Sequence, residues 1–310
     1  MSALISGSMA YDTIMVFHDK FRHHILPEKV HILNVSFLVP GLRREFGGCA
    51  GNIAYNLKQL GEEPLILATV GHDFEPYAQW LAQSVVSARY IEVLDDHYTG
   101  QAYITTDEDD NQITAFHPGA MNYAHHLHVP ADADIDIAII APNGKEGMQQ
   151  HARECREQGI PFIFDPGQGL PMFSGDELLE FVELADWLIV NDYESELLAD
   201  KTGQSIEQLA QKVKALIVTL GGNGSKIYTD GECLTIPAAR PQAINDPTGC
   251  GDAYRAGVLY GLINGFAWDV TGRIAAILGA IKIEHHGTQN HGFDLDQVRA
   301  RYLENFGGSF

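Results

Sequence analysis

The sequence predicts an α/β protein with a mostly parallel central sheet and a small second sheet. Short apolar, β-branched runs recur along the chain, longer amphipathic stretches lie between them, and two strand-rich segments interrupt this alternation. Such alternation is typical of parallel strands joined by crossover helices. A chain of 310 residues with 45% hydrophobic content is long enough to bury a large core.

The predicted strands of the main sheet are short apolar runs at residues 3–5, 65–70, 137–141, 162–164, 187–190 and 216–220. Helical patterns lie between and after them, at residues 52–60, 145–158, 205–214, 252–264 and 270–284. In this arrangement helices cover both faces of the sheet. Ligands are then expected at the carboxyl ends of the strands.

Residues 15–46 and 93–116 are rich in β-branched and aromatic residues but lack a helical repeat of adequate length. We predict strands outside the main sheet, with residues 99–116 forming a hairpin around an acidic turn. The expected division places residues 1–12, 47–92 and 117–310 in the α/β domain, and residues 13–46 and 93–116 in a β lid. Such a lid closes over an active site and excludes water. A hairpin that only decorates the surface has the same pattern.

Composition argues against several classes of partner. The net charge of -21 repels polyanions, and no basic run is longer than Arg43-Arg44, so nucleic acid is not an expected ligand. The longest apolar run, at residues 274–283, is shorter than the roughly 20 residues that cross a bilayer. Four cysteines without a Cys-x-x-Cys pair, and no secretory signal pattern, predict free thiols in the cytoplasm.

The strongest functional signal is Asp246-Pro247-Thr248-Gly249-Cys250-Gly251-Asp252, directly ahead of a helical pattern. A glycine-rich turn that opens a helix presents backbone N–H groups and the positive end of the helix dipole to an anion. The amides of Gly249, Cys250 and Gly251 would then stabilise a transferring phosphoryl group. Asp252 would accept the proton of the attacking hydroxyl. An ordinary helix N-cap would place the same residue types here.

Two further motifs suit a polyol. Gly48 lies in a second glycine-rich entry to a helix, where Asn52 offers a donor and an acceptor to a sugar hydroxyl. Asp12 follows the first strand, and a carboxylate at that edge can bridge two vicinal hydroxyls. Tight helix packing and a turn-stabilising aspartate are the structural alternatives.

Two stretches at strand ends suit a nucleotide. Asn191 and Glu194 follow the strand at 187–190, and they could hold phosphate oxygens and magnesium-bound water. Thr219, Gly221 and Gly224 follow the next strand and offer a hydroxyl and backbone amides. Loop-forming polar residues would look similar. No Gly-x-x-x-x-Gly-Lys-Ser/Thr motif is present. The histidines near residues 126 and 286 lack metal-ligand spacing, so we predict surface or loop histidines.

In this order, these motifs resemble the ribokinase-like, or PfkB, family of sugar and nucleoside kinases over nearly the whole chain. The resemblance implies a three-layer α/β/α domain with a small β-sheet lid. It implies that Asp252 is the base and that the amides of residues 249–251 form the anion hole, with Gly249 and Gly251 also on ATP. Asn191 and Glu194 match the family's magnesium and phosphate motif. Asp12, Gly48 and Asn52 match its sugar-hydroxyl ligands.

Within the family, the sequence is most similar to bacterial adenosine kinases of the actinobacterial type. The stretches that carry this resemblance are Leu26-Pro27-Glu28, residues 36–39, 48–52, 118–121, 191–194, 246–249 and 251–253. The resemblance places Ser8, Ser36, Phe116 and Gln168 around the purine. Two residues depart from the pattern: Ala102 stands in place of an aromatic and Gly169 in place of a second glutamine. Tyr103 should point to the face opposite residue 102.

The resemblance also implies magnesium held through Glu194, a potassium-type cation near Asp246 and a homodimer formed through the lid. The function it implies is ATP-dependent phosphorylation of the 5′-hydroxyl of a ribonucleoside, with adenosine as the expected substrate. A kinase for ribose or fructose, favoured by Ala102, and a non-catalytic nucleoside-binding protein are the alternatives.

Overall fold

The computed structural model describes residues 1–25, 34–109 and 111–310. Within these residues, nine strands form one sheet and four form a second. In spatial order the large sheet contains β13 (Glu232–Ile236), β12 (Ser225–Thr229), β11 (Ala215–Thr219), β10 (Trp187–Asn191), β9 (Phe162–Phe164), β8 (Ile137–Ile140), β1 (Ser2–Ser6), β4 (Glu63–Gly71) and β5 (Ile91–Leu94).

The large sheet is parallel from β5 to β11, and β12 and β13 add an antiparallel edge. Each of the six predicted strands overlaps one of these parallel strands, with ends that differ by two residues or fewer. The predicted mostly parallel sheet is therefore confirmed. The strands β5, β12 and β13 were not predicted, because their short runs carry more polar and exposed residues.

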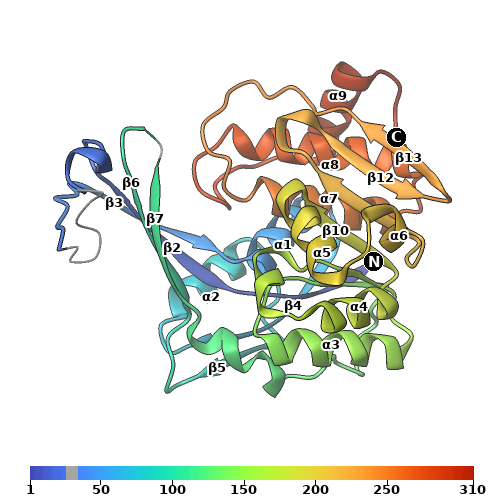
Figure 1. Cartoon of the computed structure of the whole chain (residues 1–310), viewed down its shortest axis with the longest axis horizontal. Helices are drawn as coiled ribbons and strands as arrows, with labels where there is room; N and C mark the ends of the chain where they lie inside the picture. Colours follow the sequence, from blue (N-terminus) through green and yellow to red (C-terminus); the bar gives the residue numbers. More distant parts are fainter. Residues whose placement is uncertain (26–33, 110) are drawn as a thin grey trace.

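Successive side chains of the central strands enter two separate cores. Ala3 and Ile5 of β1 lie in the core on one face, and Leu4 lies in the core on the other face. Helices α1 (Cys49–Gln59), α2 (Glu75–Gln83), α7 (Cys250–Ile263), α8 (Trp268–Ile283) and α9 (Leu295–Phe306) pack on the first face. Helices α3 (Lys145–Gln158), α4 (Gly175–Leu184), α5 (Asp192–Thr202) and α6 (Ile206–Ala210) pack on the second. The three predicted layers are present (Figure 1).

Helix α6 is shorter than predicted. The pattern at residues 205–214 predicts one helix, but α6 ends at Ala210. The amide of Lys214 donates to the carbonyl of Asp186, and β11 begins at the next residue. The residues between must turn, whatever their helical propensity.

The second sheet contains β3 (Gly41–Gly47), β2 (Ala10–Val16), β6 (Gly100–Thr106) and β7 (Gln112–His117), and it projects from one side of the α/β body (Figure 1). Strands β6 and β7 pair antiparallel, as the hairpin pattern predicts. The Asp107 carboxylate accepts the amides of Asp109 and Asn111 and so stabilises the turn. The Leu26-Pro27-Glu28 stretch lies outside the described residues.

Candidate active site

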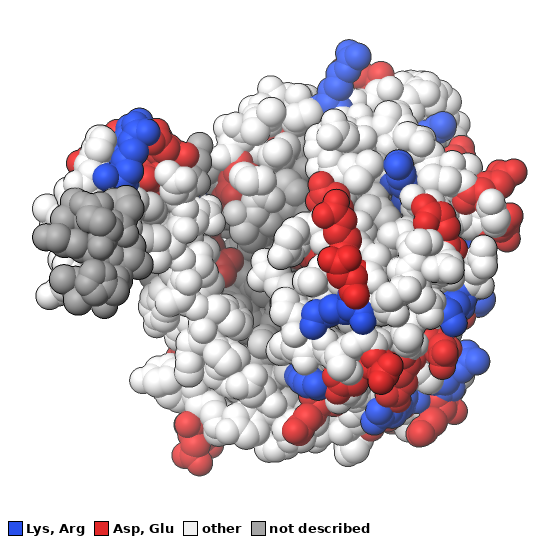
Figure 2. All heavy atoms as spheres, viewed as in Figure 1, with Lys and Arg blue, Asp and Glu red and all other residues white. Residues whose placement is uncertain are grey.

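Three of the predicted site residues, Asp12, Asn52 and Asp252, come together where β2, α1 and α7 meet. The surface is hollowed between the second sheet and the α/β body, and acidic atoms are visible inside the hollow (Figure 2). Asn52 Nδ2 donates to Asp252 Oδ2 at 2.8 Å, although 200 residues separate them in sequence. The charge of Asp252 in turn acts on Asp12.

Asp252 is not the N-cap of α7. The helix starts at Cys250, and its N-cap is Gly249, with φ of 80° and no side-chain cap. The Asp252 carboxylate instead faces Asn52. Burial raises the pKa of Asp252 to about 6, although Arg255 and the Asn52 hydrogen bond act in the opposite direction. A carboxylate with this pKa is ionised at neutral pH and can still accept a proton.

The glycine turn ahead of α7 keeps part of its donor capacity free. The Cys250 amide donates to the Pro247 carbonyl at 3.2 Å, so it closes a turn. The amides of Gly249 and Gly251 have no acceptor within the described part of the chain. Two of the three predicted anion-hole donors are therefore free in this conformation.

Asn52 is held in one orientation by three residues that no sequence motif contains. Gln289 Nε2 donates to Asn52 Oδ1 at 3.0 Å and to the Tyr77 hydroxyl at 2.6 Å. Trp80 Nε1 donates to Gln289 Oε1 at 2.9 Å, which fixes the Gln289 amide. With its oxygen committed to Gln289, Asn52 must present its NH₂ group to Asp252. No sequence signal marks this network, because its members lie on three separate segments.

Asp12 lies above the glycines that precede α1. A Cβ on Gly47 would come within 2.5 Å of Asp12 Oδ2, and a Cβ on Gly48 would come within 2.5 Å of the Ser8 carbonyl oxygen. Gly48 is therefore required by close approach to the backbone, whereas a Cβ on Gly47 would displace the end of the Asp12 side chain. Burial, followed by the charges of Asp252, Glu45 and Asp246, raises the pKa of Asp12 to about 6.

A row of residues in register connects Asp12 to Phe116. Asp12 pairs with Ala102 of β6, and Ala102 pairs with Phe116 of β7, so the three side chains share one face of the second sheet. Phe116 is 51% exposed, which leaves its ring available for stacking. Tyr103 points to the other face, where its hydroxyl donates to Gln101 Oε1, and it does not replace the missing aromatic at position 102.

The other predicted purine contacts are dispersed. Ser8 is buried, and its hydroxyl accepts the Cys49 amide at 3.2 Å. Ser36 is exposed on the segment ahead of β3, and Gln168 is exposed on the 3₁₀ turn η4 (Gly167–Met172) after β9. No hydrogen bond among the described residues links Ser36 or Gln168 to the Asp252 cluster.

The predicted nucleotide residues lie at the ends of β10 and β11. Asn191 and Glu194 form a reciprocal capping box at the start of α5: Glu194 N donates to Asn191 Oδ1, and Asn191 N donates to Glu194 Oε2. This cap leaves the Asn191 NH₂ group and one Glu194 oxygen for other partners. Burial and the charge of Asp165 raise the pKa of Glu194. The Thr219 hydroxyl donates weakly to the Val190 carbonyl at 3.5 Å.

Gly221 and Gly224 differ in what they offer a nucleotide. A Cβ on Gly221 would meet nothing within 4 Å, so its backbone faces open space. Gly224 is buried, its amide donates to the Gly221 carbonyl, and a Cβ there would come within 2.1 Å of the Ile236 carbonyl oxygen. Packing against β13 therefore explains the glycine at 224, and its amide is engaged within the turn, so its contact with ATP stays a prediction.

A buried ion pair beside Asp252 was missed from sequence. Arg255 lies one turn after Asp252 on α7 and donates through Nε and Nη2 to both carboxylate oxygens of Asp165, the second at 2.6 Å. Arg255 is also charge-coupled to Asp252 and Glu194. The i, i+3 spacing from Asp252 was the available signal. This guanidinium offsets part of the negative charge of the site.

Within residues 1–25, 34–109 and 111–310, no group of three His, Cys, Asp or Glu side chains could hold a metal ion. The free oxygen of Glu194 suits a magnesium ion that carries most of its ligands as phosphate oxygens and water. His291 lies in a loop, as predicted, but it is buried and hydrogen bonded to Asn56 Oδ1.

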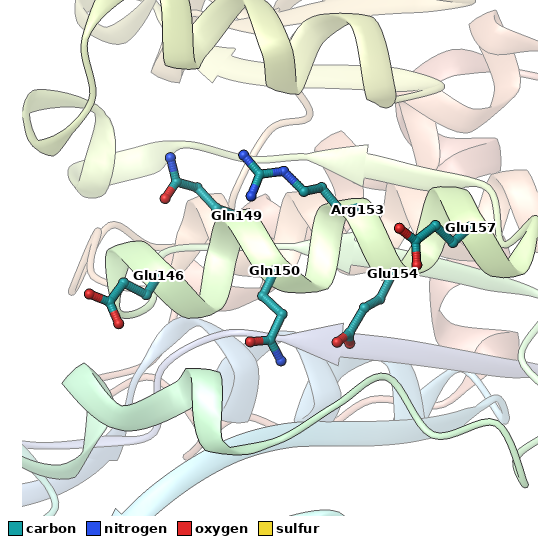
Figure 3. Close-up of a pocket in the computed structure, with 6 residues that line it drawn as sticks. All are labelled: Glu146, Gln149, Gln150, Arg153, Glu154 and Glu157. Atoms are coloured by element: carbon teal, nitrogen blue, oxygen red, sulfur yellow. The ribbon is translucent and has the colours of Figure 1, made fainter.

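A second hollow lies along α3, away from these residues. Figure 3 shows its six lining side chains, all of which belong to this one helix. Arg153 pairs with Glu180, and Glu154 pairs with His128. None of the predicted site residues lines this hollow, and its charges are explained by surface ion pairs. The described helices are also too short or too polar to span a membrane.

Comparison with known proteins gives the family of this chain. Residues 11–294 match the pfkB family of carbohydrate kinases. This chain therefore belongs to the pfkB family.

Several relatives cover nearly the whole chain. A nucleoside kinase from Burkholderia thailandensis, solved in complex with inosine, is 49% identical, covers 99% of each chain and superposes with a TM-score of 0.91. The same enzyme has been solved in complex with ADP-inosine, with a TM-score of 0.89. The nucleoside kinase of Methanocaldococcus jannaschii is 34% identical over 276 residues, covering 88% of this chain and 91% of that protein. Its structure superposes with a TM-score of 0.90.

Proposed function

We propose that this protein transfers the γ-phosphoryl group of ATP to the 5′-hydroxyl of a purine ribonucleoside. Adenosine is the substrate expected from sequence, and inosine is the nucleoside bound by the Burkholderia thailandensis relative. The observation that carries the proposal is the Asn52–Asp252 contact beside the free amides of Gly249 and Gly251. This contact supports a base at Asp252 next to a helix start that can bind an anion.

In this proposal, Asp252 accepts the proton of the 5′-hydroxyl as that oxygen attacks the γ-phosphorus in line. The amides of Gly249 and Gly251 stabilise the charge on the transferring group, and the Cys250 amide joins them if the Pro247 turn opens. Because the phosphoryl group itself offers little covalent chemistry to the protein, positioning and electrostatics supply most of the acceleration.

The ribose is proposed to lie against Asp12, Gly48 and Asn52. Asp12 presents a carboxylate that can accept from two vicinal hydroxyls, and Gly48 allows a close backbone approach. The base is proposed to stack on Phe116, which shares a sheet face with Asp12. Ala102, between them, adds no bulk to this face. Ser8, Ser36 and Gln168 remain predicted contacts of the base.

ATP is proposed to lie across the ends of β10 and β11, with Asn191 and Thr219 near the phosphates and Gly221 offering open backbone. The ADP-inosine complex of the relative supports ATP as the donor. Glu194 would hold magnesium through water. A magnesium ion there would neutralise charge on the phosphate oxygens during transfer.

The second sheet is proposed to act as the lid. The lid expected from sequence, residues 13–46 and 93–116, contains most of this sheet, although β2 begins at Ala10 and residues 93–94 belong to β5 of the large sheet. It carries Phe116 and one wall of the hollow in Figure 2. Every residue of β7 is exposed, and an exposed edge strand can pair with a second chain, which supports a homodimer through the lid. Light scattering on a size-exclusion column should give the mass of two chains, and the mass of one chain would contradict the dimer.

A coupled assay of ADP release across adenosine, inosine, uridine, ribose and fructose tests the function. We expect kcat/KM for a purine nucleoside to exceed that for ribose or fructose by about tenfold or more. Mass spectrometry of the product should show the 5′-monophosphate. A preference for ribose or fructose would support the sugar-kinase alternative, and nucleoside binding without ADP release would support a non-catalytic binding protein.

A further inference from the structure

Lys282, near the end of α8, is a fully buried lysine that contacts the loop before α7. Its side chain has no exposed surface. Its Nζ donates to the Asp246 carbonyl oxygen at 2.9 Å and to the His285 carbonyl oxygen at 3.0 Å. Burial of an ammonium is unfavourable unless it is paired, so this lysine needs the two carbonyls and nearby negative charge.

The ammonium lies directly behind the glycine turn. A Cβ on Gly249 would come within 3.5 Å of Lys282 Cε, so the lysine side chain passes close to the N-cap residue of α7. Burial raises the pKa of Cys250 to about 11, and the charge of Lys282 acts against this rise. Burial also acts to raise the pKa of Asp246, but hydrogen bonds from Thr248 and Gly287, together with the charge of Lys282, lower it overall. Its positive charge therefore acts on the segment that carries the free amides.

The same arrangement does not fit a potassium ion at the position that the family resemblance implies. A monovalent cation near Asp246 would bind backbone carbonyl oxygens, which are the acceptors that Lys282 already uses. The Asp246 carboxylate is also engaged, with the amides of Thr248 and Gly287 at 2.9 and 3.0 Å. An ammonium and a potassium ion at this place would repel each other and compete for the same oxygens.

We propose that the Lys282 ammonium supplies from within the chain the positive charge behind the Gly249 turn, so that phosphoryl transfer by this protein needs no potassium. This inference rests on the proposed kinase activity for its kinetic consequence. Lys282 is then a positioning residue, because it acts through the Asp246–Gly249 turn and not on the substrate. Its position on the Asp246 and His285 carbonyl oxygens is testable without any activity.

The kinetic test compares potassium with tetramethylammonium at equal ionic strength, using the Tris salt of ATP, magnesium and the best nucleoside. We expect the wild-type kcat to differ by less than about twofold between the two cations, since the charge is already present. Stimulation by potassium of about tenfold or more would overturn the proposal. Absence of ADP release in both buffers would count against the proposed function instead. Ion binding at the Asp246 and His285 carbonyl oxygens would then test the present proposal.

The binding test uses thallium(I) as a heavy substitute for potassium in crystals. We expect no anomalous peak near the Asp246 and His285 carbonyl oxygens of the wild-type protein. Lys282→Ala, which frees these oxygens, should show a peak there. A thallium ion bound to both carbonyls of the wild-type protein would overturn the proposal whether or not the protein is active.

A rescue experiment separates charge from structure. In tetramethylammonium, Lys282→Ala should lose about tenfold in kcat, and added potassium or ammonium should restore most of it. Lys212→Met removes an exposed lysine and is the matched control, with unchanged kcat. Full activity of Lys282→Ala without any added cation would overturn the proposal. If this variant fails to fold, the two wild-type measurements decide the question.

Discussion

Two glycine-rich helix starts, at α1 and at α7, look alike in sequence but use their backbones differently. Both begin after a glycine with positive φ, 85° at Gly48 and 80° at Gly249, and neither has a side-chain cap. At α1, Ser8 accepts both the Cys49 amide, through its hydroxyl, and the Ala50 amide, through its carbonyl. At α7, the Gly251 amide has no acceptor within the described residues.

The difference shows how one motif can have its amides hydrogen bonded in one place and free in another. At the start of α1, the amides of Cys49 and Ala50 are hydrogen bonded to Ser8 in the β1–β2 connection. These bonds hold the start of the helix that carries Asn52, which lies beside Asp252. The α7 start leaves donors free, and positive charge from Lys282 and Arg255 lies around it. The helix dipole is the same in both cases, so the neighbours decide which start can hold a phosphate.

Replacement of the proposed base is expected to have the largest effect. Asp252→Asn keeps the shape but cannot accept a proton, so kcat should fall by about 10²- to 10⁴-fold. The coupled ADP assay measures this, and an unchanged melting temperature would show that the fold is intact. Residual turnover within about tenfold of wild type would contradict the assigned role.

The two glycines should separate stability from activity. Gly48→Ala forces a Cβ to within 2.5 Å of the Ser8 carbonyl oxygen, so the free energy of unfolding should fall by roughly 3 kcal/mol or more. At Gly249→Ala the new Cβ meets side chains and no backbone, with the Thr288 side chain nearest at 3.1 Å. It should cost about 1–2 kcal/mol and lower kcat by about tenfold. Urea unfolding and the ADP assay check both, and equal stability losses would remove the contrast between the two starts.

Activity should decline in mild acid. The pKa of Asp252 is raised to about 6, and the ionised form is the base, so kcat/KM should fall about tenfold per pH unit below this value. Because the pKa of Asp12 is also about 6, Asp12→Asn serves as the control. An acid limb that persists in that variant belongs to Asp252. A flat profile down to pH 4.5 would contradict the raised pKa.

The smallest effect is expected at Trp80, which supports Asn52 of α1 only indirectly, through Gln289. Trp80→Phe keeps the stacking on Phe46 but removes the N–H group that fixes Gln289, and through it Asn52. Stability should fall by about 1–2 kcal/mol and kcat by about two- to fivefold. Tyr55→Phe, which removes a hydrogen bond to the His291 carbonyl, is the matched control. It should lose stability only, and an equal loss of kcat in both variants would exclude a specific role of the network.

Local patterns were sufficient for the main strands and for several helices. The strand at 162–164 and the helix at 145–158 coincide with β9 and α3, because apolar runs and amphipathic periods are local signals. Helices α4 and α5 were missed, although Ser174 with Glu177 and Asn191 with Glu194 carry the capping-box spacing. In the sequence, the pair of Asn191 and Glu194 indicated only a nucleotide motif.

The sequence by itself determined the layered fold and the family, and it predicted a site at Asp12, Asn52 and Asp252, because glycine turns and polar strand ends are local features. Tertiary structure decided the rest. It showed that Gly224 is held by packing, that Gln289 and Trp80 orient Asn52, and that Lys282 occupies the carbonyls behind Gly249. Such contacts join residues far apart in the chain, and no local pattern encodes which donor meets which acceptor.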